Sequence, residues 1–145
     1  MASNVKYAVS ATPIVEVTDS EASGTWSAIA KDVGKTLGGS GSVTCVWGDT
    51  IGYTDGDPTH VVATTATSLG TFSSVKFVFI KHSGYTDDAR ETATESTLSV
   101  MEGGNQFAVL GPGDALVLPF AVADTPVFTG TSSSGAIAVE VMGTA

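Results

Sequence analysis

The residue types most often used for catalysis or metal binding are represented in this chain by two histidines, His60 and His82, and one cysteine, Cys45. His82 is followed closely by Ser83 and Asp87, which supply the other two residue types of a nucleophilic triad. Triads are assembled from distant parts of a chain, and no Gly-x-Ser-x-Gly turn accompanies these residues. We therefore interpret His82 as a surface or strand-end histidine. We expect no catalytic residue and no enzyme activity.

Acidic residues near glycine-rich turns are the next candidates for chemistry. Asp49, Asp55 and Asp57 could offer carboxylate oxygens to calcium. Their spacing fits no known calcium loop, and the bidentate glutamate of an EF-hand is missing. Asp-Gly and Asp-Pro pairs are also typical of turns. We predict no metal site, with calcium at the Asp55/Asp57 loop, or at Asp87 and Asp88, left as an alternative.

Two further fragments resemble parts of ligand-binding motifs. Gly34-Lys35-Thr36 matches the end of a phosphate-binding loop, but Ile29 stands where the motif needs its first glycine. The segment from Gly113-Asp114 to Pro119 is similar to the opening of the second cupin motif. The histidine that binds metal in cupins has no counterpart in residues 120–128. A left-handed glycine and an aspartate that braces a turn explain the segment without a metal, and we expect no cofactor.

The charge of the chain excludes two classes of partner. Only six basic residues face fifteen acidic ones, for a net charge of −9. Binding to nucleic acid or to an anionic membrane needs clustered Lys and Arg, so we expect neither. Charged residues make up only 14% of the chain, so Gly, Ser and Thr must cover much of the surface. Such side chains lose little entropy when packed against a partner.

The single cysteine also limits the possibilities. Cys45 can form no intrachain disulfide, and its apolar surroundings in Val43–Trp47 favour a small buried hydrophobe.

The N-terminus lacks the basic start and apolar stretch of a signal peptide, so we expect synthesis in a reducing cytoplasm.

Short apolar runs separated by turn residues dominate the pattern and predict an all-β fold, a β-sandwich or jelly roll. Val75–Lys81 is the strongest strand, and because it is apolar on both faces we expect it to be central or to lie between the core and a partner. One short helix is predicted near residues 20–34, where Trp26, Ile29 and Val33 recur at helical spacing. Glycine-rich Leu37–Ser42 predicts a loop. We expect one β domain over residues 1–145, with residues 1–13 as an extended arm.

The order of these features resembles that of small tailed-bacteriophage virion structural proteins. The resemblance rests on five features in this order: a short N-terminal strand, a Trp-bearing segment, Ser/Thr/Gly-rich strands, the run Val75–Lys81, and the ending Gly111-Pro-Gly-Asp-Ala-Leu-Val-Leu-Pro-Phe followed by Ala136–Met142. The resemblance implies a capsid decoration, or cement, protein of jelly-roll type. Such proteins often form trimers over the symmetry axes of a capsid.

From the resemblance and the absence of chemistry we expect a viral structural protein of the virion, made in the host cytoplasm. It would form a homo-oligomer, with a trimer favoured, and dock on the major capsid protein or another virion protein. A tail, neck or fibre component is one alternative. A carbohydrate- or calcium-binding β module is another, with Trp26, Trp47, Tyr53 and Tyr85 as stacking residues.

Overall fold

The computed structural model of the chain describes residues 2–11, 15–19, 24–28, 37–46, 59–71 and 74–144. These residues form strands and turns without a helix, so none of them belongs to a membrane-spanning helix. The all-β fold predicted from the sequence is confirmed. The chain divides into two compact units, one of Lys6–Ser42 and one of Met1–Val5 with Val43–Ala145. The expectation of one domain over residues 1–145 stays a prediction.

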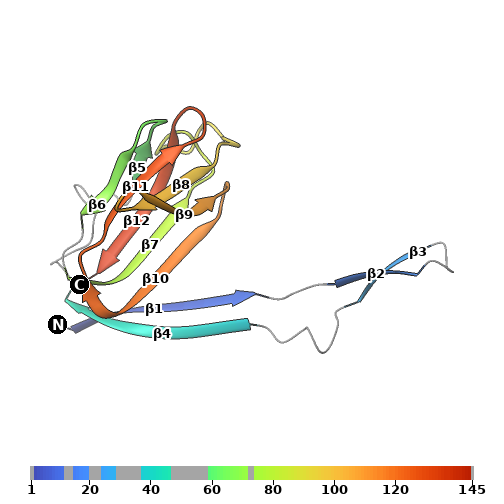
Figure 1. Ribbon diagram of the computed structural model, residues 1–145, viewed down its shortest axis with the longest axis horizontal. Coiled ribbons are helices and arrows are strands. Elements are labelled where there is room, and N and C mark those ends of the chain that lie inside the picture. Colours follow the sequence, from blue (N-terminus) through green and yellow to red (C-terminus); the bar gives the residue numbers. More distant parts are fainter. Residues whose placement is uncertain are drawn as a thin grey trace. The chain divides into compact units, whose positions relative to one another are not determined.

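The larger unit is a β-sandwich of two four-stranded sheets (Figure 1). One sheet has the strand order β10-β7-β12-β5, and the other has the order β6-β11-β8-β9. The bounds are β5 (Thr59–Val62), β6 (Thr67–Thr71), β7 (Val75–His82), β8 (Leu98–Glu102), β9 (Asn105–Leu110), β10 (Ala115–Asp124), β11 (Val127–Ser132) and β12 (Ile137–Thr144).

The strand pairing is that of a jelly roll. β8 pairs with β9, β7 with β10, β6 with β11 and β5 with β12, all antiparallel. The eight strands are thus one long hairpin of four nested pairs. Rolling that hairpin up brings β7 beside β12 and β8 beside β11, which closes the two sheets.

The core lies between the two sheets and takes side chains from both. β7 is an interior strand, as predicted, with Val78 and Ile80 in the core. On its other face Phe77 is only 2% exposed. The buried cluster consists of Val62, Leu69, Val75, Val78, Ile80, Leu98, Val100, Leu110, Phe128, Ile137, Val139 and Val141.

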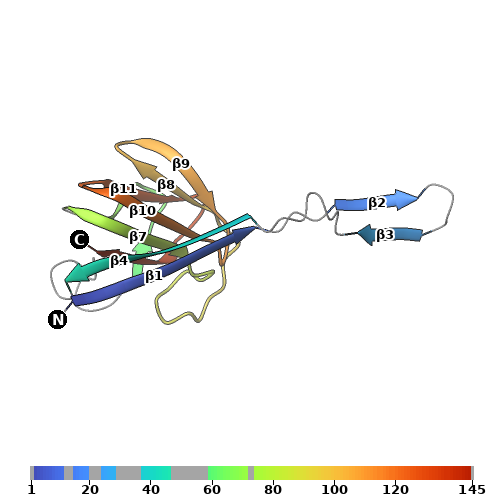
Figure 2. The same ribbon diagram turned by 90° about the horizontal axis from the view of Figure 1, so that it is seen from below.

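The smaller unit is built from two-stranded pairs, which we call the ribbon. β1 (Ala2–Ala11) enters it and pairs with β4 (Leu37–Val46), which runs in the opposite direction (Figure 2). Between them in sequence, β2 (Val15–Asp19) pairs antiparallel with β3 (Gly24–Ala28). The four strands therefore form a second set of nested pairs.

The ribbon corrects the helix predicted near residues 20–34. Residues 24–28 form β3, in which Trp26 is paired with Val17 and Thr25 with Thr18. Glycine, threonine and tryptophan are weak helix formers, and pairing with the β-branched residues of β2 decides the local structure. The remaining residues of the predicted helix lie outside the described part of the chain.

The ribbon also corrects the loop predicted for Leu37–Ser42, which belongs to β4. Tyr7 explains one of the glycines in this strand, Gly41. A Cβ built on Gly41 would collide with the Tyr7 ring, so the ring lies across the strand over this glycine. An aromatic side chain that covers a glycine restores the packing which the missing side chain removes.

The tightest point of the core gives a stability prediction. A Cβ on Gly130 in β11 would lie 3.1 Å from Leu69 Cδ2, 3.1 Å from Leu98 Cδ1 and 3.3 Å from Val62 Cγ2. We expect Gly130→Ala to lower the free energy of unfolding in urea by about 1–3 kcal/mol, because overpacking forces core side chains to shift.

Gly39→Ala is the matched control, because a Cβ there meets nothing within 4 Å. Its free energy of unfolding should stay within about 0.5 kcal/mol of the parent value. An equal urea midpoint for Gly130→Ala and the parent protein would contradict the close packing around Gly130.

Candidate functional site

The structure places His82 at the end of β7 and fully buries it, with none of its side chain exposed. The Gly84 N–H donates to Nδ1 at 3.0 Å, and Nε2 lies 2.8 Å from the Ser96 carbonyl oxygen. A backbone N–H can only donate and a carbonyl can only accept, so Nε2 carries the proton of a neutral ring. His82 therefore lies at the end of a strand, as predicted, but it is not on the surface. Its ring connects two loop segments inside the protein.

The other members of the suggested triad do not face this ring. The Ser83 hydroxyl accepts a hydrogen bond from the Tyr85 N–H at 3.2 Å. Asp87 accepts from the Thr86 hydroxyl and from two backbone N–H groups. Both His82 nitrogens are occupied by the backbone. The three side chains therefore hold the segment 83–97 rather than one another.

Asp87 organises the tip of this segment. Its Oδ1 accepts from the Glu91 N–H at 3.0 Å, and its Oδ2 accepts from the Thr92 N–H at 3.1 Å. Hydrogen bonds from the backbone of Glu91, and then from Thr92, Thr86 and Arg90, outweigh partial desolvation and lower the pKa of Asp87 below its ordinary value. This carboxylate is thus engaged by loop donors on both oxygens.

Many of the other predicted candidates fall where the structure gives no side chain. Asp49, Asp55, Asp57, Trp47 and Tyr53 lie outside the described residues, and so does the Gly-Lys-Thr fragment of residues 34–36. The same holds for the side chains of three residues that belong to described strands, Trp26, Cys45 and His60. Among the described side chains, no group of three or more His, Cys, Asp or Glu could hold a metal ion.

The Gly-Pro-Gly-Asp segment before β10 is a turn, as the sequence predicts. Gly113 has φ of +86°, and the Asp114 N–H donates to the Gly111 carbonyl at 3.0 Å, the pattern of a type II turn. The Asp114 carboxylate accepts from the Gly111 N–H at 2.8 Å. The aspartate therefore braces the backbone, which is the structural role expected for it.

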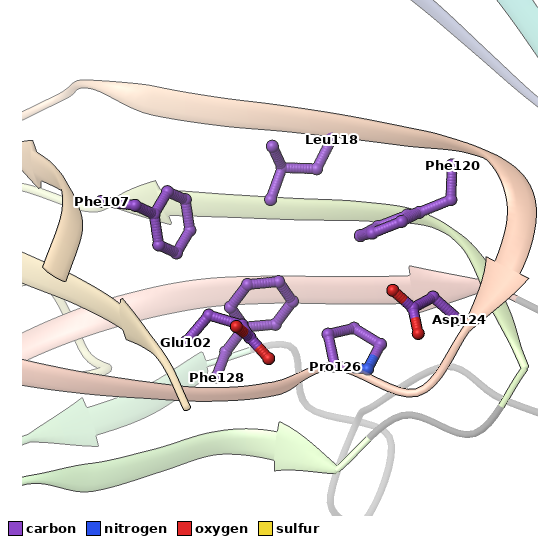
Figure 3. Close-up of a pocket in the computed structure, with 7 residues that line it drawn as sticks. All are labelled: Glu102, Phe107, Leu118, Phe120, Asp124, Pro126 and Phe128. Atoms are coloured by element: carbon purple, nitrogen blue, oxygen red, sulfur yellow. The ribbon is translucent and has the colours of Figure 1, made fainter. Parts of the chain in front are cut away.

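A pocket of about 300 Å³ lies between the two sheets at the edge formed by β9 and β10 (Figure 3). Its interior is aromatic and aliphatic, and the carboxylates of Glu102 and Asp124 lie on either side of Pro126. The rings of Phe107 and Phe128 are tilted by 52° with centroids 5.8 Å apart. The lining residues are Glu102, Phe107, Leu118, Phe120, Asp124, Pro126 and Phe128.

A β-bulge in the edge strand β9 turns Phe107 into this pocket. Val100 pairs with Ala108, but the next residue, Met101, pairs with Gln106, so Phe107 is the extra residue. Ala108 and Leu110 pack in the core, and regular alternation would point Phe107 to the outer face. The bulge redirects its ring toward Phe128.

The edge strand β10 has a larger irregularity on the opposite side of the pocket. Pro119 pairs with Phe77, whereas Asp124 pairs with Val75, so β10 contains three more residues than β7 across this step. Proline cannot donate a ladder hydrogen bond, which suits a strand that is paired on one side only. The segment with the extra residues contains Phe120, and at its end Asp124 lies at the edge of the pocket.

Sequence reasoning missed the pocket because it sought stacking residues among Trp and Tyr. Of those, Tyr85 is the one with a described side chain; it is half-buried, its backbone bridges to Ala93, and it does not line the pocket. The one signal present was Pro119 inside an apolar strand, which indicates an edge strand or a bulge. Nothing local marks Phe107 as a bulge residue.

The Asp87 loop gives a prediction with a defined pH dependence. Since the pKa of Asp87 is lowered in the folded protein, its stabilisation of the loop is present above the ordinary carboxyl value and is lost as pH falls through the folded-state pKa. We expect the Glu91 and Thr92 amides to lose hydrogen-exchange protection over that acidic range, as measured by NMR.

In Asp87→Asn the same two amides should be less protected at neutral pH and should show no such transition. Asp88→Asn is the control, because no described hydrogen bond uses the exposed Asp88 side chain. Equal protection in Asp87→Asn and the parent protein would contradict the role given to this carboxylate.

No family model, no curated protein and no solved structure matches the chain.

Proposed function

We propose that the protein is a structural component of a tailed-phage particle, a capsid decoration protein. In this role it self-associates, with a trimer favoured, and docks on the shell of the major capsid protein. One observation carries the proposal: the chain places the residues from Lys6 to Ser42 in a unit separate from the sandwich, and its described strands form two-stranded pairs.

A two-stranded ribbon has little stability in isolation. No described side chain of residues 4–11 or 38–43 is buried, whereas the sandwich encloses an apolar core. A hairpin without a third strand or a packed face is marginal in water. The ribbon therefore gains most of its stability from contact with other protein, which is what an assembly element requires.

The edges of the ribbon supply the means of contact. In the described part of the chain, β1 and β4 pair only with each other, so each strand has one edge without a neighbouring strand. Such an edge can add a strand of another protein through backbone hydrogen bonds. Val9, 53% exposed on β1, offers apolar surface that the contact would bury.

The fold and the charge agree with this role. Jelly rolls occur in viral capsids, but also in lectins and cupins, so the fold by itself supports more than one function. The sandwich unit has eleven acidic and three basic residues, a net charge of −8 that suits a basic partner surface. The neutral Ser, Thr and Gly surface can be packed at little entropic cost.

Size-exclusion chromatography with light scattering tests self-association first. We expect a mass of three chains, and co-sedimentation with purified empty shells of the virus that encodes the protein. A stable monomer that also fails to bind the shells would contradict the proposal. Sixfold or twelvefold rings would favour a place in the tail or neck.

Val9→Asp tests whether the ribbon makes the contact. Burying a charge in place of a valine should weaken self-association or shell binding by roughly tenfold or more, which corresponds to about 1.4 kcal/mol. Val61→Asp is the matched control, since Val61 is 50% exposed on β5 of the sandwich. A larger effect of Val61→Asp than of Val9→Asp would move the interface from the ribbon to the sandwich.

A further inference from the structure

The pocket at the β9–β10 edge holds aromatic surface that its own side chains leave uncovered. Phe128 is buried at 2% exposure, whereas Phe107 packs on it and is still 46% exposed. Without the bulge in β9, Phe107 would lie on the outer face. The bulge therefore creates a half-covered aromatic wall, with Phe120 and Leu118 of β10 lying opposite (Figure 3).

The rim of the pocket is acidic. Glu102 ends β8 and Asp124 ends β10, and both are exposed. The described ion pairs include neither of them, and the described hydrogen bond of the Asp124 carboxylate comes from the Thr125 N–H at 2.8 Å. Two described cations, Lys81 and Arg90, instead pair with Glu140 on the face of β12.

From this combination we infer that the pocket binds an arginine side chain presented by a partner protein. The stem of the arginine would lie on Leu118 and Phe120, and its guanidinium would stack on Phe107 at the end of the pocket that holds Glu102, with Asp124 at the other end beside Phe120 (Figure 3). The net charge of −8 on the sandwich favours such a basic partner. The pocket belongs to the sandwich, so this inference does not depend on the ribbon.

Three properties of the site favour arginine over other occupants. A volume of about 300 Å³ is at the small end of ligand pockets, which suits one side chain better than a large ligand. A planar guanidinium stacks on an aromatic face and binds carboxylates through two parallel hydrogen bonds. A lysine ammonium is more strongly hydrated and has no flat face to stack on Phe107.

An NMR titration of the whole protein with N-acetyl-arginine amide tests the inference. We expect saturable shifts of the ring signals of Phe107, Phe120 and Phe128, with a dissociation constant on the order of 1–10 mM for this single side chain. N-acetyl-citrulline amide, which has the same shape without the charge, should bind at least about fivefold more weakly. N-acetyl-lysine amide should bind more weakly than the arginine probe.

Variants locate the binding. Glu102→Gln together with Asp124→Asn should raise the dissociation constant of the arginine probe about fivefold or more and leave the urea midpoint unchanged. Glu95→Gln, which removes an exposed carboxylate outside the pocket lining, is the control and should change neither quantity.

Three results would overturn the inference: no saturable shift at the pocket rings, equal binding of citrulline and arginine probes, or equal binding in the double variant and the parent. Lysine binding as tight as arginine binding would overturn the assignment to a guanidinium. None of these results depends on oligomerisation, so they are separate from the test of the proposed assembly role.

Discussion

Closure of the two sheets around one apolar core is the constraint on which the rest of the structure depends. β7 and β12 of one sheet face β8 and β11 of the other, and the core side chains come from all four. Gly130 shows how close the approach is, because three aliphatic side chains lie within 3.3 Å of the position that a Cβ would take. Rolling up the nested hairpin buries the apolar faces of its two halves against each other. The jelly roll is the result.

The pocket lies where this constraint is weakest. Interior strands must keep strict alternation, because a slip of one residue would turn their apolar side chains to solvent. β9 and β10 are paired on one side only, so each can accommodate extra residues. The bulge at Phe107 and the excursion after Pro119 use that freedom. They open the pocket without disturbing the pairs between β7 and β12.

The ribbon and the sandwich differ in whether their described side chains are buried in a core. The sandwich has an apolar core of its own and fully buries His82, which bonds two loop segments through both ring nitrogens. Within the described residues, no side chain of 4–11 in β1 or of 38–43 in β4 is buried, and each of these two strands has one edge without a neighbouring strand. A chain that combines a self-sufficient fold with such an element is suited to attachment, which is the basis of the proposed role in a particle.

The sequence by itself determined the all-β class, the central position of Val75–Lys81 and the turn at Gly113-Asp114, because local periodicity and turn chemistry act over a few residues. It predicted a helix near residues 20–34 and a loop at Leu37–Ser42, because it could not show that Val17 would pair with Trp26 or that Tyr7 would cover Gly41. Only the tertiary structure decided the burial of His82 and the pocket at Phe107, Glu102 and Asp124. The ring of His82 is held by backbone groups of Gly84 and Ser96, and the pocket depends on register shifts of β9 against β8 and of β10 against β7. Local periodicity reveals neither the partners of a side chain nor the pairing register of a strand, because both are set by contacts between segments of the folded chain.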